Sequence, residues 1–271
     1  MKDNTADDLA RLVAAVAASS SYKTVCGDLV ISIGRSELLK RRNLKEALKA
    51  TKNKLHQVAG AYLAGETHYA GWLAELSDAA SSSDSAVLRD ACRRIMNVHS
   101  STRERLPILE SFYDATLSTC APIHSVLDLA CGFNPLAIPW MPLAARASYI
   151  ACDIFSDMMS FIQGFLSIMK LSGEGRACDV LTHVPDQAVD VALLLKAIPC
   201  LEQMDKAAGL RLLDAVHARH VLVSFPVASL TGRDKGMLVN YEHRFRAMIS
   251  ERDWAVQRFE FNTELAFLVT K

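Results

Sequence analysis

The sequence predicts an α/β protein in which an N-terminal helical region precedes a Rossmann-like, mostly parallel sheet. Three observations predict this fold class: helical periodicity in the first hundred residues, strand–helix alternation after Pro122, and a tight turn of small residues behind the first strand. The short β-like runs lie at Ser125–Leu129, Ala147–Cys152, Val189–Leu194 and His220–Phe225. Alternation of this kind is typical of parallel strands covered by helices on both faces.

The first hundred residues carry apolar side chains at helical spacing. Leu9–Ala18 is rich in Ala, Leu and Val, and the apolar positions between Leu38 and Leu63 recur at a period near 3.6, which predicts one helix there. The serine-rich stretch Ser81–Ser85 predicts a break before a helix that runs to Val98. Ser101–Glu104 matches a capping box and predicts the start of a helix that continues to Leu117. We therefore expect a helical domain over 1–108 and a sheet domain over 109–271.

The C-terminal end has the pattern of a hairpin. Val256–Phe261 and Leu265–Thr270 are β-like runs on either side of a short polar turn. The predicted sheet therefore ends in an antiparallel pair, which gives seven strands when a short strand before Cys178 is included.

Composition excludes several classes of protein. The longest uninterrupted apolar run, Leu12–Ala18, is far shorter than the roughly 20 residues needed to span a bilayer. Three aspartates among the first twelve residues argue against a signal peptide. The seven cysteines form no CxxC motif, so we interpret them as reduced thiols in a cytoplasmic protein without a metal site. We also expect a monomer.

The zero net charge hides an asymmetry. Residues 1–107 carry 16 basic and 12 acidic side chains, and residues 108–271 carry 14 and 18. The segment Arg35–Lys54 alone has eight basic and two acidic side chains, and part of it forms a ridge at helical spacing. Such a ridge is either an ordinary solvated surface or a face for a polyanion. The candidate RNA-binding residues are Arg35, Lys40, Arg41, Arg42, Lys45, Lys49 and Lys52.

The sharpest motif is the turn that follows the first predicted strand, Asp128–Pro135. It contains one glycine, Gly132, and no Gly-Lys-Ser/Thr, so it is neither a dinucleotide fingerprint nor a P-loop. One small-residue turn cannot wrap a pyrophosphate, but it suffices for a ligand that has none. S-adenosylmethionine is such a ligand.

Acidic residues follow the next two strands. Asp153 lies 21 residues after Gly132, the spacing at which a carboxylate accepts hydrogen bonds from both ribose hydroxyls of an adenosyl group. Asp179 lies where an acidic side chain can meet the adenine amino group. Taken alone, Asp153 could equally be a helix N-cap, but with Asp128 the three aspartates favour an adenosyl pocket in a class I methyltransferase fold.

The fourth strand ends at Lys196, with no aromatic residue behind it. Many methyltransferases that act on an exocyclic nitrogen have an Asn/Asp-Pro-Pro-aromatic turn here. A ring nitrogen such as guanine N7 already exposes a lone pair, so it would need alignment rather than a general base. Lys196 could contact a base or a phosphate, or it could be a solvent-exposed lysine at a strand end.

Taken together, these residues resemble the aminoglycoside-resistance 16S ribosomal RNA methyltransferases, which modify N7 of guanine 1405. The resemblance extends over nearly the whole chain. The segments that carry it are Lys54–His56, Gly60–Tyr62, His99–Leu106, Asp128–Gly132, Asn134–Leu136, Leu194–Lys196, Ser224–Pro226, Gly232–Arg233, Lys235–Met237, Asn240–Tyr241 and Glu264–Leu265.

The resemblance implies roles for several of the matching residues. Arg105 would pair with the methionine carboxylate of S-adenosylmethionine, which suits a guanidinium, although a solvent-exposed helix arginine is the alternative. His99 could instead cap a helix or fill the core. Lys196 and Arg233 would engage the target nucleotide or its phosphates, and Lys235 would bind RNA. The remaining implied cofactor contacts are Tyr62, Ser100, Ser101, Ala130, Gly132, Asp153, Asp179, Val180 and Leu195.

One departure bears on the RNA. Family members usually carry Pro-x-Thr-Val-Arg-Arg near the N-terminus, and this chain has Gly27–Ser32 there, without either arginine. Arg35 and the basic run Lys40–Arg42 could replace that contact.

The resemblance implies methylation of guanine 1405 in the 16S RNA of the 30S subunit, with S-adenosylmethionine as cofactor and aminoglycoside resistance as the consequence. Two alternatives stay open. One is a methyltransferase for another ribosomal nucleotide or for a small molecule, which would not need the basic region. The other is a ribosome-binding factor that has lost catalysis.

Overall fold

The computed structural model describes residues 2–59, 67–227 and 237–271, and these form a seven-stranded sheet in the order β3-β2-β1-β4-β5-β7-β6. The first five strands in sequence are parallel, and β7 runs antiparallel between β5 and β6. The predicted fold class and terminal hairpin are therefore confirmed. The strands are β1 (Ile123–Leu129), β2 (Leu143–Asp153), β3 (Ser172–Ala177), β4 (Val189–Leu195), β5 (Ala218–Pro226), β6 (Ala255–Glu260) and β7 (Glu264–Thr270).

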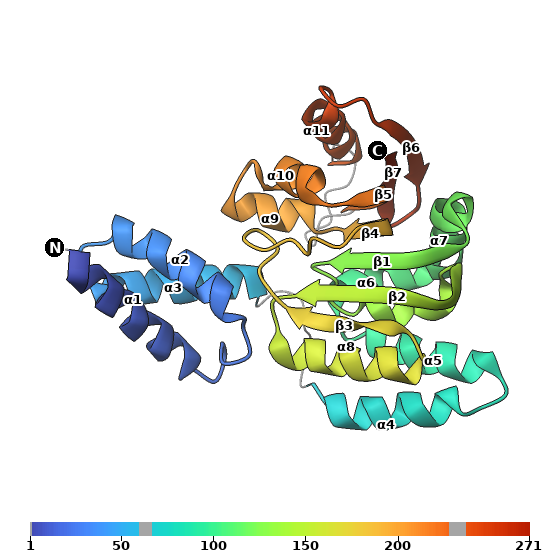
Figure 1. Cartoon of the computed structure of the whole chain (residues 1–271), viewed down its shortest axis with the longest axis horizontal. Coiled ribbons are helices and arrows are strands. Elements are labelled where there is room, and N and C mark those ends of the chain that lie inside the picture. The colour runs from blue at the N-terminus through green and yellow to red at the C-terminus, as the bar shows by residue number, and fades with distance from the viewer. Residues whose placement is uncertain (1, 60–66, 228–236) are drawn as a thin grey trace.

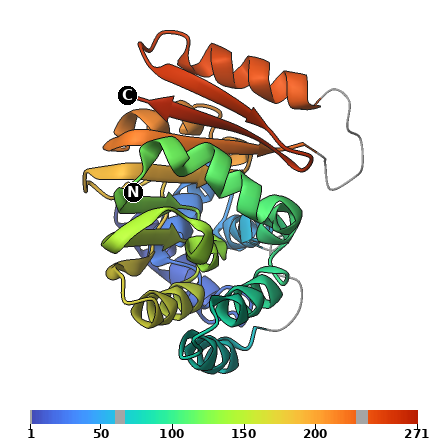
Figure 2. The same ribbon diagram turned by 90° about the vertical axis from the view of Figure 1, so that its right-hand side faces the viewer.

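Helices cover both faces of the sheet (Figures 1 and 2). Successive side chains of a strand point to opposite faces, so Val191 and Leu193 of β4 join one core and Ala192 and Leu194 the other. The first core includes the helices α4 (Tyr69–Ala80), α5 (Ser85–Met96), α7 (Leu109–Leu117) and α8 (Ser156–Ile168). The second includes α9 (Ile198–Met204), α10 (Ala208–Ala215) and α11 (Met237–Ile249). The hairpin β6–β7 and α11 lie at one end of the molecule, and α4 lies at the other.

The first three helices form a unit of their own beside the carboxyl ends of the parallel strands (Figure 1). Their separate core includes Leu12, Leu29 and Leu55. The helices are α1 (Lys2–Ala17), α2 (Gly27–Lys40) and α3 (Leu44–Ala59). A short antiparallel bridge joins Val25 to Phe155, just beyond β2.

Helices α4 and α5 pack in the same core as the sheet, although they precede residue 108. The expected boundary at 108 therefore falls inside the layer that covers the sheet. The unit with a separate core consists of α1–α3, and it ends by residue 59 among the described residues.

Two helix predictions were wrong in detail. The single helix expected over 38–63 is divided, because α2 ends at Lys40 and Asn43 begins a new helix by accepting a hydrogen bond from the Glu46 backbone N–H at 2.9 Å. The capping box at Ser101 is also absent. Helix α6 (Ser100–Arg105) has His99 as its N-cap, and a 3-10 turn separates it from α7. The Glu104 carboxylate accepts a hydrogen bond from Lys196 instead of from the backbone at the helix start.

No helix in the described parts of the chain combines the length and the apolar character needed to cross a membrane.

Candidate functional site

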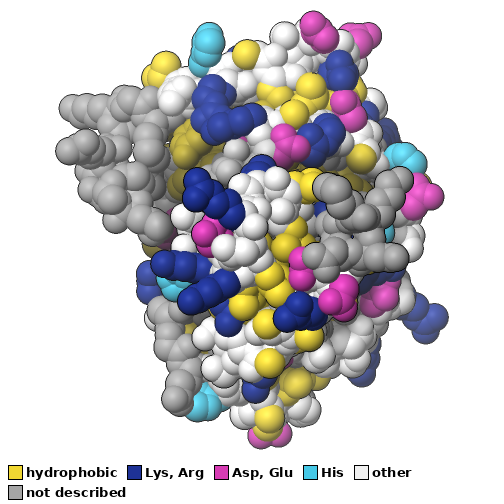
Figure 3. Space-filling view, turned by 90° about the vertical axis from the view of Figure 1, so that its left-hand side faces the viewer, with side chains coloured by type: hydrophobic (Ala, Val, Ile, Leu, Met, Phe, Trp, Pro, Cys, Tyr) yellow, Lys and Arg dark blue, Asp and Glu magenta, His cyan; other side chains and the backbone are white. Residues whose placement is uncertain are grey.

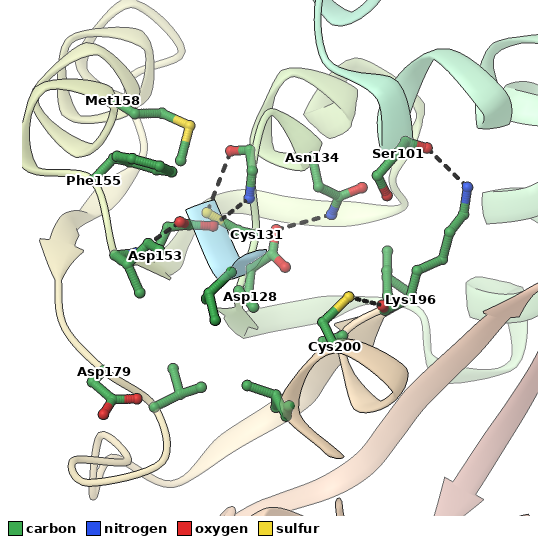
Figure 4. A pocket seen from close by; sticks show the side chains of 18 of the residues that line it. Ser101, Asp128, Cys131, Asn134, Asp153, Phe155, Met158, Asp179, Lys196 and Cys200 are labelled. Carbon is green, nitrogen blue, oxygen red and sulfur yellow. Dashed lines mark hydrogen bonds between the residues drawn. The ribbon is translucent and has the colours of Figure 1, made fainter. Parts of the chain in front are cut away.

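A pocket lies at the carboxyl ends of β1, β2 and β4, where ligands bind in sheets of this type (Figure 4). The structure brings together ten of the residues expected to bind the cofactor or the target. They are His99, Ser101, Arg105, Ala130, Gly132, Asp153, Asp179, Val180, Leu195 and Lys196. Ser100 does not line this pocket, and Tyr62, Arg233 and Lys235 lie outside the described residues.

The turn after β1 is built from residues in the left-handed backbone region. Ala130 and Gly132 both have φ 51°, and a Cβ added to Gly132 would lie 2.7 Å from Cε1 of His99. The left-handed backbone favours glycine at 132, although Ala130 adopts the same φ, and the close approach of the imidazole ring leaves no room for a Cβ without a shift of His99. The turn leaves an open space over the end of β1 instead of filling it with side chains.

Asp153, at the end of β2, holds this turn in place. Its Oδ2 accepts a hydrogen bond from the Gly132 N–H at 2.9 Å, and its Oδ1 accepts one from the Ile154 N–H at 2.7 Å. Burial raises the pKa of Asp153, and these N–H donors oppose the rise. The N-cap of α8 is Phe155, so the alternative of a helix-capping role for Asp153 is excluded.

Two further aspartates place carboxylate oxygens in the pocket wall without a partner among the described residues. Asp179 is 3% exposed; its Oδ1 accepts the Leu181 N–H at 3.0 Å, and its buried Oδ2 lacks a partner. Asp128 uses Oδ2 to accept from Asn134 and Tyr149 and leaves Oδ1 without one. Burial raises the pKa of Asp179 and raises that of Asp128 to about 6. Since a buried acceptor without a donor is costly, these oxygens indicate a hydrogen-bonding ligand.

Arg105 is only 1% exposed, which excludes the alternative of a solvated helix arginine. Its Nε and Nη2 donate to the carboxylate of Glu264 at 2.7–3.2 Å, and its Nη1 donates to Oδ1 of Asn134 at 2.8 Å. At least three of the five guanidinium protons are thus used inside the protein, and the side chain also lines the pocket. Burial would raise the pKa of Glu264, but the cations of Arg105 and Lys196 lower it below its usual value.

Lys196 follows β4 in the left-handed region, with φ 57°. Its side chain is buried, so the alternative of a solvent-exposed lysine at a strand end is excluded. Its Nζ donates to the Ser101 carbonyl at 2.9 Å and to Glu104 at 2.8 Å, and the sticks of Figure 4 show it reaching from β4 toward α6. His99 lies beside the same wall, tilted against Phe133 at 5.5 Å between ring centroids. Burial, followed by the charges of Lys196 and Arg105, lowers the pKa of His99 to about 4, so the ring is neutral near pH 7.

Sequence reasoning assigned no role to several residues that build this pocket. Glu264 and Asn134 belong to segments that carry the family resemblance, and this was the one signal available for them. Leu29 of α2 and Val58 of α3 also line the pocket, and no sequence pattern links them to it. The α1–α3 unit therefore supplies part of the cofactor wall.

The described residues contain no cluster of three or more His, Cys, Asp or Glu side chains able to hold a metal ion.

The basic residues expected on the N-terminal helices are at the surface. Arg35, Lys40, Arg42, Lys45 and Lys49 are exposed, and no ion pair within the described parts of the chain involves them. Lys52, the remaining member of the ridge on α3, is partly exposed. Figure 3, which faces this unit, shows several groups of Lys and Arg side chains around a strip of hydrophobic atoms.

Arg41 differs from its neighbours on this surface. Its Nε lies 2.9 Å from Oε2 of Glu37, which is buried and also binds Lys54 at 2.7 Å. Part of the positive charge of Arg41 is thus neutralised inside the protein.

Comparisons with known proteins agree with this arrangement. Residues 18–268 match the family model described as ribosomal RNA methyltransferase (FmrO). A 16S rRNA (guanine(1405)-N(7))-methyltransferase of Micromonospora echinospora is 36% identical over 98% of this chain and 97% of its own length. The solved structure of the 16S rRNA methylase RmtB has a TM-score of 0.79 at 27% identity and covers 97% of this chain and 98% of its own. The 16S rRNA methyltransferase RmtF, solved with S-adenosyl-L-homocysteine, has a TM-score of 0.79 at 26% identity, with the same coverage.

Proposed function

Because this chain belongs to the FmrO family of ribosomal RNA methyltransferases, we propose that it methylates N7 of guanine 1405 in the 16S RNA of the 30S subunit. S-adenosylmethionine is the methyl donor, and aminoglycoside resistance is the consequence. The observation that carries the proposal is a pocket with two orphaned carboxylate oxygens and a buried guanidinium, combined with full-length similarity to enzymes named for this reaction.

The residues of the pocket suit S-adenosylmethionine. Asp153 would bind the ribose hydroxyls, and Oδ2 of Asp179 would accept from the adenine amino group, with Val180 and Leu195 against the ring. Arg105, which lines the pocket, would donate to the methionine carboxylate. The cofactor supplies a methyl group on a positively charged sulfur.

Methyl transfer to N7 requires no proton removal. The N7 lone pair forms a bond to the methyl carbon while the electrons of the carbon–sulfur bond leave with sulfur, so the sulfur becomes neutral and the guanine ring becomes positive. The protein therefore contributes alignment and electrostatics. We propose that Lys196 and Arg233 orient the target nucleotide.

Recognition of the RNA would depend on the surface of α1–α3. The exposed cations Arg35, Lys40, Arg42, Lys45 and Lys49 would contact phosphates, and Lys52, Arg41 and Lys235 would add to them. A guanine inside folded RNA must leave its stack to reach the pocket, so the enzyme would extrude it. A ribosomal substrate implies action in the cytoplasm, and we propose that the enzyme acts as a monomer.

The experiment that tests the function is mass-spectrometric mapping of methylated nucleotides in 30S subunits treated with the protein and labelled S-adenosylmethionine. We expect one added methyl group on N7 of guanine 1405. Label at another nucleotide would support the first alternative, and binding without methyl transfer would support the inactive ribosome-binding factor.

The cofactor pocket is tested separately by calorimetry. Replacement Asp153→Asn removes the charge and the second acceptor for the ribose hydroxyls, so S-adenosylmethionine affinity should fall at least tenfold, or about 1.4 kcal/mol. Asp186→Asn, at a side chain that is 95% exposed and does not line the pocket, is the matched control. Unchanged affinity of Asp153→Asn would contradict the pocket assignment.

A further inference from the structure

Four charged side chains meet between α6, β4 and β7. Arg105 and Lys196 line the pocket, and Glu104 and Glu264 pair with them without lining it. Arg105 and Glu104 come from α6, Lys196 follows β4, and Glu264 begins β7. The Lys196 ammonium lies 2.8 Å from Oε2 of Glu104 and 3.6 Å from Oε2 of Glu264. Two cations and two anions therefore balance one another beside the ligand space.

The pairing within this group is not symmetrical. Glu264 is 0% exposed and already accepts the bidentate bond of Arg105 and a hydrogen bond from the Ser224 hydroxyl. Its negative charge is thus largely committed to Arg105. Glu104 is the nearer carboxylate to Lys196, and no other cation pairs with it among the described residues.

The backbone fixes where the Lys196 side chain begins. Its left-handed φ is maintained by the Lys196 N–H, which donates to the carbonyl and hydroxyl oxygens of Ser224 at 3.0 and 3.1 Å. The Ser101 carbonyl and Glu104 then hold the other end of the side chain. Lys196 is therefore held at both ends, and its contact with Glu104 is a side-chain contact that a substitution can remove without altering the backbone.

We infer that Glu104 is a positioning residue that neutralises Lys196, so that this wall of the pocket accepts a cationic methyl donor and then a cationic methylated guanine. This inference rests on the proposed function. Without Glu104, the buried ammonium would leave an uncompensated positive charge in a place of low dielectric. That charge would repel the sulfonium of S-adenosylmethionine but not the neutral sulfur of S-adenosylhomocysteine.

The test compares the affinities of the two compounds by calorimetry. For Glu104→Gln we expect the ratio of S-adenosylmethionine to S-adenosylhomocysteine affinity to fall roughly three- to tenfold. This is the effect expected when one uncompensated charge repels another across several ångströms in a partly screened site. Glu104→Asp keeps the charge and should keep the ratio close to that of the wild type. The double replacement Glu104→Gln with Lys196→Met removes both charges and should restore the ratio even though methylation is lost.

The control is Glu110→Gln on α7, which removes an exposed carboxylate paired with Arg93 and should change neither affinity. A fall in both affinities of Glu104→Gln by the same factor would show a merely structural role and overturn the inference. A wild-type protein that binds neither compound would contradict the proposed function instead. The two failures are therefore distinguishable.

Discussion

At the scale of single residues, the pocket depends on ionisable side chains that the fold withdraws from water. Asp128, Arg105 and Glu264 are each 1% exposed or less, and each is held by named hydrogen bonds. Such groups are stabilising only while their partners are present, because a buried charge without a partner costs several kcal/mol. Individual replacements here should therefore have large effects.

His99 makes the stability of the protein depend on pH. Its pKa is about 4 in the folded protein and near 6.5 when unfolded, so between these values the unfolded chain binds more protons and stability falls as the pH falls. Between pH 7 and 5, His99 should remove about 2 kcal/mol from the free energy of unfolding. Asp128, with its raised pKa, acts in the opposite direction below pH 6, so the effect is measured by comparing variants.

The comparison uses urea unfolding of His99→Asn and of His217→Asn, a control in which the imidazole is exposed. The fall in unfolding free energy between pH 7 and pH 5 should be smaller in His99→Asn than in the wild type, and it should be unchanged in His217→Asn. Equal losses in all three proteins would show that His99 does not titrate as stated.

Gly132 is a second residue at which one substitution has a defined cost. In Gly132→Ala, the new Cβ would meet His99 at 2.7 Å on a left-handed backbone, so we expect a loss of about 1–3 kcal/mol in unfolding free energy and weaker cofactor binding. Gly71→Ala, in α4 with nothing within 4 Å of its Cβ, should be neutral or stabilising. Thermal unfolding measures the stability of both variants, and calorimetry measures their cofactor affinity. Equal stability and equal cofactor affinity in the two variants would contradict the prediction.

At the scale of elements, the basic residues of α2 and α3 and of the turn between them form two groups, one paired with a buried carboxylate and one exposed to solvent. Glu37 holds Arg41 and Lys54, and this cluster joins the two helices. Burial would raise the pKa of Glu37, but these two cations lower it. The exposed side chains of Lys45 and Lys49 take no part in this cluster, and they are the ones for which we propose contacts with RNA.

This division predicts different effects on RNA binding. The double replacement Lys45→Gln with Lys49→Gln should weaken 30S binding and reduce the slope of log affinity against log salt by about 1.4–1.8, because two phosphate contacts are lost. Arg41→Gln should change the slope less and should instead lower the free energy of unfolding, since Glu37 loses a partner. Filter binding at several salt concentrations measures both, and identical slopes for the two variants would contradict the division.

At the scale of the whole molecule, the N-terminal unit is coupled to the cofactor site. Leu29 and Val58 line the pocket, and the Cys26 N–H donates to the Ile154 carbonyl at 2.7 Å, directly after Asp153. The unit for which we propose RNA binding thus also forms part of the wall of the cofactor pocket. Deletion of residues 1–107 would remove this wall and also α4 and α5, so it cannot distinguish an RNA enzyme from a small-molecule enzyme.

Leu29→Ala tests this coupling without disrupting the sheet. Leu29 is 2% exposed and lines the pocket, whereas Val30, 4% exposed, packs only in the core of α1–α3. Both alanine variants should lose stability, but only Leu29→Ala should bind S-adenosylhomocysteine several-fold more weakly in calorimetry. Equal cofactor affinity in the two variants would show that the unit does not contribute to the site.

Local patterns predicted the sheet class, the terminal hairpin and the positions of Gly132, Asp153, Asp179 and Lys196. They could do so because strand periodicity and turn chemistry act over a few residues, and the carboxyl ends of parallel strands meet at one edge. The family resemblance added Arg105, His99 and Ser101, which no local pattern places there.

The tertiary structure alone decided how these groups are paired. Arg105 and Glu264 are separated by 159 positions and form a buried ion pair, and Lys196 is held by Glu104 across 92 positions. Which helices cover the sheet and which form a separate unit was also decided by packing, since α4 and α5 bury apolar side chains in the core of the sheet and α1–α3 bury theirs in another core. Periodicity records which face of an element is buried, but it does not identify the partner, because burial free energy is not directional.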